Sequence, residues 1–542
     1  MAFITEWLST PTGRVQDRAR LATYLVLGAA TLSPLLWASV PPLVDYPNHL
    51  ARMWILVHRE EIPELARDYV VHWRILPDLA MDFVVPALST VMPVELAGRV
   101  FIALTMLGLI AGTATLHRVL HGRFAVWPVW SVLFVYNAVL FWGFLSCLFA
   151  IAVYLFMFSA WIATREWRMV PRILVFAAAG ALLFLLHLFA FGLYGLSVSS
   201  YEVGCRLKDR RLPLKSLASC AVVCLQFVPG LLLWYASLGE VTSAYTEYGG
   251  LGHKVYALFA PVDFGFFPAW LDRGMWAAVS VFLLLAAKRG AIKLAPGMRL
   301  PLAALLVTAV LMPYRANGSA LADIRLPVTL PFVILASTQF AVSRKWLLRL
   351  LGGVALFGFG LRIWTVSESW KDYDRWFNEF RAASAVIAPG ARLLIVQASI
   401  AEQNTIPEDK KRLPSVPAAL AMVQTTAFWH IGALAVIDRS AFYPYIITEF
   451  TPLDVTPRNR AVLGSGRPVT PEDLARSVDP GVAKSLDTLR DIFGRRLFWS
   501  DWPQAFDYVL WIDYGGMPKP RLTQLRPLAS GSVFEIYQII KQ

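Results

Sequence analysis

Long runs of apolar residues recur along most of this chain, separated by short segments rich in Arg and Lys. A helix needs roughly 20 mostly apolar residues to cross a bilayer, and by that measure we expect about eleven spanning helices. They fall at residues 21–40, 97–116, 124–143, 145–163, 172–187, 188–204, 217–237, 273–287, 299–314, 326–342 and 346–366. The segment 77–92 is interrupted by Asp78, Asp82 and Pro86, so we expect it to lie along the membrane surface as an amphipathic helix.

The basic residues between these runs indicate the orientation of the chain. Cytoplasmic loops are enriched in Lys and Arg, and with a cytoplasmic N-terminus every basic loop falls on that side. The outer side then receives the segments 41–96, 238–271, 314–325 and 367–542. The first apolar run ends at Pro41-Pro42 without a small-residue cleavage site, so we expect it to remain as an anchor. The prediction is a multi-pass protein of the bacterial inner membrane.

The segment after the last apolar run has a different pattern. Its polar and apolar residues mix, and Pro and Gly separate short strand-like runs. We expect strands at 392–397, 433–438, 506–513 and 533–539, with helical stretches at 372–387 and 471–477 and a loop at 405–417. The predicted fold is therefore a polytopic α-helical membrane domain over 1–366, whose outer loop 41–96 carries interfacial helices, and a periplasmic α/β domain over 367–542.

Composition agrees with this class. The 542 residues are 57% hydrophobic and 16% charged, which is too apolar for an ordinary soluble protein. A net charge of +13 would suggest nucleic-acid binding if the protein were soluble. Here the Lys and Arg residues lie in loops between apolar runs, so we expect no nucleic-acid partner. All four cysteines lie before the C-terminal segment, which therefore cannot form a disulfide of its own.

The first outer loop opens with the motif Asp45-Tyr46-Pro47-Asn48-His49. A carboxylate just beyond the first span can meet a lipid headgroup and an aqueous acceptor together. His49 and Arg52 follow at helical spacing. We interpret Asp45 as a general base, His49 as its orienting partner and Arg52 as a phosphate clamp. The alternative is that Asp45 only caps the helix that follows, since Asp before Pro often begins one.

A second candidate group lies around the short outer loop before the tenth predicted span. Arg315 and Arg325 flank it, and the planar guanidinium suits phosphate because it donates two parallel hydrogen bonds. Tyr314 and Asn317 could contact sugar hydroxyls. The alternative is that Arg325 anchors the end of the span and pairs with Asp323.

His187 lies near the outer end of an apolar run, where a polar residue is a functional candidate by default. A hydrogen-bonded histidine that only packs helices together is an equal alternative. The long outer loop adds weaker candidates that could order over a substrate, namely Glu240, Glu247, His253 and Lys254.

The order of these elements resembles the GT-C superfamily of membrane glycosyltransferases that use polyprenyl-phosphate sugars, of the mannosyl- and arabinosyl-transferring type. The resemblance extends through residue 366. Asp45 occupies the place of the family's acidic residue after the first span. The other matching segments are 77–92 as the interfacial helix, Glu95-Leu96-Ala97-Gly98-Arg99 as the entry to the next span, 117–123 as the basic inner turn, and Asp323-Ile324-Arg325-Leu326-Pro327 as the opening of a late span.

The resemblance implies an inverting hexosyl- or pentosyltransferase that moves a sugar from a polyprenyl-phosphate carrier to a glycan, lipid or protein acceptor on the outer side. It also leaves Mg²⁺ or Mn²⁺ open as a cofactor. Two departures from the family's pattern argue against a metal site with two carboxylates: the neighbour of Asp45 is Tyr46, and the turn 142–147 has no carboxylate. Either the enzyme works without metal, or His49 and a distant carboxylate complete the site.

Two other classes of function remain open. One is a flippase or transporter of a lipid-linked glycan, although few ionisable residues lie within the apolar runs. The other is a non-catalytic envelope assembly factor whose outer domain binds a partner.

Overall fold

A computed structural model describes residues 11–206, 214–238, 245–262, 269–316, 319–340, 345–397, 425–464, 469–479, 497–513 and 521–541. The chain divides into two compact units. We call the first the helical unit; it comprises Met1–Leu36, Ile75–Met81 and Val100–Ser367. We call the second the mixed unit; it comprises Trp37–Arg74, Asp82–Arg99 and Glu368–Gln542.

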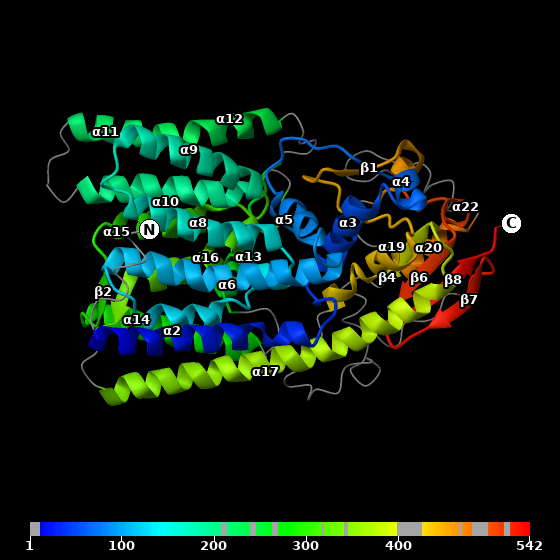
Figure 1. Ribbon diagram of the computed structural model, residues 1–542. Helices are drawn as coiled ribbons and strands as arrows, with labels where there is room; N and C mark the ends of the chain where they lie inside the picture. Colours follow the sequence, from blue (N-terminus) through cyan, green and yellow to red (C-terminus); the bar gives the residue numbers. More distant parts are fainter. Residues whose placement is uncertain are drawn as a thin grey trace. The chain divides into compact units, whose positions relative to one another are not determined.

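In the helical unit, long helices run alongside one another (Figure 1), and α10 packs against α8, α9 and α15. Two of its helices, α6 and α17, continue into the mixed unit. Its elements are α2 (Pro11–Leu32), the 3-10 helix η2 (Ser33–Leu36), α6 (Val94–His121), η3 (Trp127–Phe134), α7 (Ala138–Phe141), α8 (Leu145–Ala163), α9 (Met169–Leu186), α10 (Leu188–Arg206), α11 (Leu214–Cys224), η5 (Leu225–Phe227), α12 (Val228–Ser237), α13 (Leu251–Phe259), α14 (Ala269–Lys288), β2 (Ile292–Leu294), α15 (Arg299–Leu311), α16 (Ala322–Ser337), β3 (Thr338–Phe340) and α17 (Lys345–Ala383).

Six helical segments in the described part of the chain are long and apolar enough to cross a membrane: Asp17–Leu36, Val94–His121, Leu145–Ala163, Met169–Leu186, Ser219–Ser237 and Arg349–Val386. Each overlaps a predicted span, and α8 has the predicted bounds. The predicted span 124–143 is not one helix, because the short helices η3 and α7 are separated there. The total of eleven spans stays a prediction.

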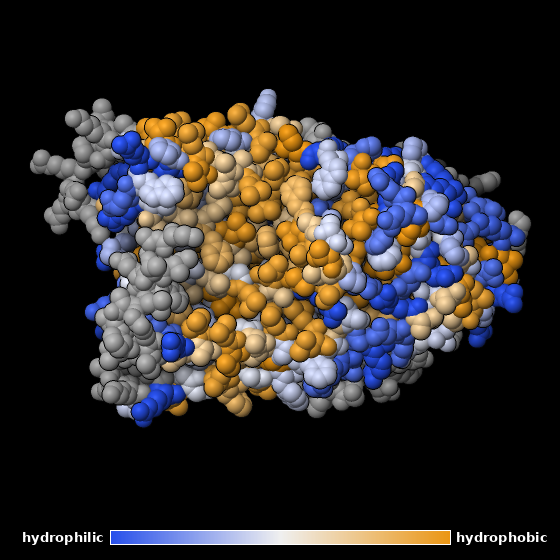
Figure 2. Space-filling model, viewed as in Figure 1, coloured by the Kyte–Doolittle hydropathy of each residue, from blue (hydrophilic) through white to orange (hydrophobic). Residues whose placement is uncertain are grey.

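The surface of the helical unit supports its contact with lipid. Figure 2 shows hydrophobic side chains over much of the visible face of this unit. Large apolar residues are exposed on several helices, among them Val26, Leu174, Leu232, Val310 and Phe357. Patches of this kind on a soluble monomer would be unusually large. A membrane explains them, because the bilayer core is as apolar as the protein interior.

The mixed unit contains a four-stranded sheet with the order β4-β6-β8-β7, in which only the pair β4 and β6 is parallel. A two-stranded antiparallel sheet joins β1 to β5. Its elements are α3 (Tyr46–His58), α4 (Pro63–Asp68), β1 (Tyr69–Val71), α5 (Ala80–Ser89), η7 (Ser384–Val386), β4 (Leu393–Gln397), η9 (Thr425–Phe428), η10 (Ile431–Ala433), α19 (Leu434–Arg439), β5 (Leu453–Val455), η11 (Pro457–Val462), α20 (Pro471–Ser477), α22 (Trp502–Ala505), β6 (Tyr508–Ile512), β7 (Leu525–Ser530) and β8 (Phe534–Ile539).

The strand pattern follows from the sequence. Strands β4 and β6 are buried along their whole length, as expected of apolar strands covered on both faces. Strand β7 lies at the edge, carries Pro527 and has an irregular register there, which is typical of a protected edge. Three predicted strands and both predicted helical stretches are confirmed. The strand predicted at 433–438 is wrong, since α19 occupies this segment, and the predicted loop 405–417 lies outside the described residues.

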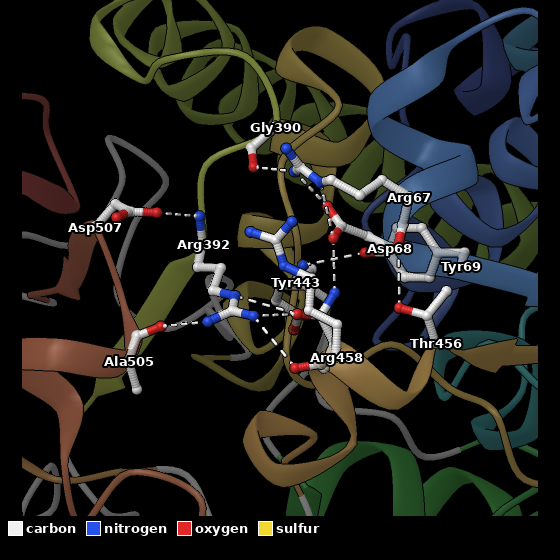
Figure 3. A network of polar contacts seen from close by, with 11 residues as sticks. Arg67, Asp68, Tyr69, Gly390, Arg392, Tyr443, Thr456, Arg458, Ala505 and Asp507 are labelled. Atoms are coloured by element: carbon white, nitrogen blue, oxygen red, sulfur yellow. Dashed lines mark hydrogen bonds and ion pairs between the residues drawn. The ribbon is translucent and has the colours of Figure 1, made fainter.

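Most of the segment 41–96 belongs to the mixed unit and is hydrogen-bonded to the C-terminal segment. Asp68 accepts a hydrogen bond from Arg67 (Figure 3). It accepts another from Asn459, and Asn459 in turn accepts two from Arg392. The backbone N–H of Arg392 donates to Asp507 (2.9 Å). The prediction grouped this loop with the membrane domain, whereas the structure groups it with residues 368–542.

Gly98 marks a close approach between α6 and α3. A Cβ placed there would collide with the hydroxyl of Tyr46 and lie 3.2 Å from Leu50. Tyr46 is fully buried, so displacing its ring would disturb the side chains packed around it. We expect Gly98→Ala to lower the free energy of unfolding by about 1–3 kcal/mol, the usual cost of overpacking. Gly358→Ala in α17 is the control, because nothing lies within 4 Å of a Cβ there. Equal thermal stability of the two variants would contradict this packing.

Candidate active site

Helix α3 begins directly after Asp45. Pro47 lies in its first turn, where its missing N–H costs no hydrogen bond. Asp45 occupies the N-cap position, but its backbone is helical (φ −88°, ψ −6°) and its side chain makes no capping hydrogen bond. A capping side chain normally requires an extended backbone at this position. The structure therefore disfavours the capping alternative and leaves the carboxylate for another partner.

That partner is His430, from the short segment between η9 and η10. His430 Nε2 lies 3.4 Å from Asp45 Oδ1, and the two side chains are 16% and 20% exposed. The pairing arises because α3 packs against η10 and α19. No motif in the sequence connects the two residues. A histidine after a tryptophan in a mixed α/β segment has no distinctive pattern, and only the fold identifies it.

His49 and Arg52 form a second group one turn along α3. Arg52 donates to His49 Nδ1 (3.2 Å) and to Asp82 Oδ2 (2.9 Å), and Arg52 and Asp82 are 3% and 0% exposed. Burial, with the charges of Arg52 and His430, lowers the pKa of His49 well below its ordinary value. His49 is therefore neutral at physiological pH. Burial also raises the pKa of Asp82, and this outweighs the opposing effect of Arg52.

These contacts limit what His49 and Arg52 can do. Arg52 directs one end of its guanidinium to a buried carboxylate, which gives it a structural role in joining α3 to α5. The histidine that pairs with Asp45 is His430 and not His49. Substrate contacts of His49 and Arg52 stay predictions.

Arg325 is a buried cation that no carboxylate among the described residues of the helical unit pairs with. It is 8% exposed, donates to Ser319 Oγ (2.7 Å), and lies 5.1 Å from the ring centre of Phe144. Its Nε has no hydrogen-bond partner, and among the described residues no carboxylate pairs with it. The alternative in which Asp323 neutralises Arg325 is wrong, because the ion-pair partner of Asp323 is Lys254 (4.0 Å). A buried, unpaired guanidinium is suited to binding an anion.

His187 lies between α9 and α10 and is also buried. Its Nδ1 accepts the backbone N–H of Phe189 (3.1 Å), so in the neutral ring the proton is on Nε2. That nitrogen lies 3.9 Å from Asp78 Oδ1, and the charge of Arg325 acts on the ring. His187, Asp78 and Arg325 therefore form one polar group in the helical unit.

The remaining predicted residues belong to the segments 238–271 and 314–325. Arg315 is paired with Glu247 (3.3 Å), and their backbones form a short antiparallel bridge. The ring of Tyr314 lies 4.4 Å from that of His253. Because Arg315 already has a carboxylate partner, Arg325 is the better candidate for an anion. Asn317 lies outside the described residues, as does Glu240.

The predicted residues thus form two groups in different units: Asp45, His49 and Arg52 in the mixed unit, and His187, Tyr314, Arg315, Asp323 and Arg325 in the helical unit. Within the described ranges, no three His, Cys, Asp or Glu side chains come together as a metal site would need. Asp45 and His430 supply two such groups, and a stable site for Mg²⁺ or Mn²⁺ needs more oxygen ligands.

No family model matches this sequence, and no curated protein matches it. Its structure is similar to two crystal structures of ArnT from Cupriavidus metallidurans. The apo structure is 14% identical in sequence and aligns with a TM-score of 0.44 over 98% of this chain and 99% of that one. The structure bound to undecaprenyl phosphate is 13% identical, with a TM-score of 0.42 over 98% of both chains. Similarity at this level carries no argument about activity, which has to be inferred from the side chains described above.

Proposed function

We propose that this protein is a glycosyltransferase of the bacterial inner membrane that takes a sugar from a polyprenyl-phosphate carrier and adds it to an acceptor on the outer side. Three properties support the proposal. The apolar surface suits a lipid-linked substrate. The buried guanidinium of Arg325 suits a phosphate. The carboxylate of Asp45 suits a proton acceptor, because no described residue bonds its second oxygen, Oδ2.

The reaction is a single displacement at the anomeric carbon of the sugar. The acceptor oxygen forms the new bond, the bond from that carbon to the phosphate oxygen breaks, and its electrons leave with the phosphate. The acceptor proton passes to Asp45 Oδ2. Arg325, assisted by Arg315, stabilises the negative charge that grows on the phosphate. This course inverts the configuration of the sugar.

The observation that carries the proposal is the state of Asp45. A carboxylate at the start of a helix would ordinarily be used as a cap, and here it is held by a histidine instead. Neither a transport path nor an assembly surface requires that arrangement.

The direct test follows the leaving group, which is the same whatever the sugar and acceptor. The purified protein is placed in proteoliposomes with undecaprenyl-phosphate sugars extracted from bacterial membranes, and free undecaprenyl phosphate is measured by mass spectrometry. We expect the extracted carriers to lose their sugar and a glycosidic product to appear. Movement of intact undecaprenyl-phosphate sugar across the bilayer, with no release of undecaprenyl phosphate, would identify a transporter and refute the proposal.

Arg325→Gln removes the charge but keeps a polar side chain. Hydrogen bonds to charged groups are worth about 1.5–3 kcal/mol, so binding of undecaprenyl phosphate should weaken roughly 10- to 100-fold. Arg325→Lys should lie between wild type and Gln, because lysine keeps the charge and loses the planar fork. The control is Arg299→Gln, at the exposed start of α15. Undiminished binding of the radiolabelled lipid phosphate to Arg325→Gln would remove this residue from the donor site.

A further inference from the structure

The amide of Asn48 is fixed in one orientation. Asn48 is fully buried. Its Oδ1 accepts the backbone N–H of Ile447 (2.9 Å), and its Nδ2 donates to the carbonyl of Tyr445 (2.7 Å). Rotating the amide by half a turn would break both bonds, so its N–H₂ group must be the one that faces His430 Nδ1, 3.1 Å away.

This orientation determines where the proton of His430 lies. Because Asn48 Nδ2 can only donate, His430 Nδ1 has to accept, and a proton on Nδ1 would face the amide protons of Asn48. The hydroxyl of Tyr443 lies 2.8 Å from the same nitrogen and 3.3 Å from the carbonyl of Trp429; since a hydroxyl can donate or accept, the orientation of Asn48 decides the tautomer. The proton of the neutral ring is therefore on Nε2, the nitrogen that lies 3.4 Å from Asp45 Oδ1.

A donor held against one oxygen of a carboxylate affects the other oxygen. It opposes rotation of the carboxylate, so that Oδ2 stays directed away from the histidine and available to accept a proton. Hydrogen bonds between catalytic groups are often long before a substrate is bound, and a separation of 3.4 Å is consistent with that.

We propose that His430 is a positioning residue for Asp45, directing its Nε2–H to the carboxylate, and that Asn48 holds His430 in the tautomer this requires. The C-terminal segment thereby contributes to the chemistry of the first outer loop. This inference rests on the proposed role of Asp45 as the base.

The activity test uses two substitutions of His430 and one control. His430→Gln keeps an amide N–H close to the place of Nε2, whereas His430→Phe fills the space without a donor. In the undecaprenyl phosphate release assay, we expect His430→Phe to lower kcat on the order of 10- to 100-fold with KM for the lipid donor nearly unchanged. His430→Gln should recover most of that loss. His72→Phe, at an exposed histidine of the same unit, should match wild type.

Asp45→Asn in the same assay separates the two proposals. If Asp45→Asn is inactive while His430→Phe keeps full kcat, the role of His430 is wrong and the base is right. If Asp45→Asn is fully active, the proposed base is wrong and the role of His430 falls with it. If His430→Gln is as inactive as a folded His430→Phe, a hydrogen-bond donor at position 430 does not support catalysis and the inference is refuted.

The tautomer can be measured without any activity. Protein labelled with ¹⁵N-histidine, compared with His430→Gln to assign the signal, should show by long-range ¹H–¹⁵N NMR a ring whose proton is on Nε2. A proton on Nδ1 of His430 would overturn the inference, even if His430→Phe fails to fold.

Discussion

Asp45→Asn should lower the rate of sugar transfer on the order of 10²- to 10⁴-fold, the range over which a positioned general base contributes. Asparagine has nearly the same shape as aspartate but cannot take the acceptor proton. Because the Asp45 side chain does not cap α3, the substitution removes no capping hydrogen bond. The thermal stability of the variant should therefore stay close to that of wild type. The measurement is release of undecaprenyl phosphate under single-turnover conditions.

Asp454→Asn is the matched control for that experiment. Asp454 lies in β5 of the same unit and pairs with the exposed Arg460. Its side chain is 25% exposed, close to the 20% of Asp45. The Asp454→Asn protein should transfer sugar at the wild-type rate. An Asp45→Asn protein that is as active as Asp454→Asn would show that the base lies elsewhere.

Arg52→Met should lower the free energy of unfolding by about 3–5 kcal/mol, because removing one partner of a buried ion pair leaves an uncompensated charge. The charge is that of Asp82, which is fully buried and has one carboxylate oxygen that no described residue hydrogen-bonds. Methionine is apolar and similar in length to arginine. The loss of stability therefore comes mainly from the unpaired charge of Asp82 and not from lost packing. Chemical denaturation in detergent measures it.

The pH dependence of that loss has a definite sign. Burial already raises the pKa of Asp82, and without Arg52 this pKa rises further. Folded Arg52→Met then keeps a proton that the unfolded chain releases, so its stability falls as pH rises from the ordinary carboxyl range through the raised value. The loss should be small in acid and largest at neutral pH.

A double variant completes that experiment. Arg52→Met with Asp82→Leu removes both charges and should recover most of the stability, since apolar replacements of buried pairs are often neutral or stabilising. If Arg52 served mainly as a phosphate clamp, Arg52→Met would weaken binding of undecaprenyl phosphate with little change in stability. That result would contradict the structural role.

The sequence was sufficient for elements whose apolar pattern is long. Helix α8 is predicted to the residue, because its nineteen apolar-rich residues are flanked by breaks. The strand predicted at 433–438 is wrong because a few apolar residues fit a buried strand and a buried helix equally well. Strands β4 and β6 are predicted correctly, because Pro, Gly or Asp residues next to them mark where the apolar runs begin or end.

The candidate site was only partly predictable. Asp45 was identified by its place after the first apolar run and Arg325 by its place before a late one, since both are local properties. The partner of Asp45 was not, because His430 is far away in the sequence and reaches Asp45 only through the packing of α3 on α19 and η10. The pairing of β1 with β5 is likewise a contact between distant segments, and the residues of neither strand predict which segment the strand pairs with.

The most direct test of the whole account is a cryo-electron microscopy map of the protein with an undecaprenyl-phosphate sugar bound. We predict that the sugar of this molecule lies with its anomeric carbon against the carboxylate of Asp45. A bound undecaprenyl-phosphate sugar whose sugar makes no contact with Asp45 would contradict this role.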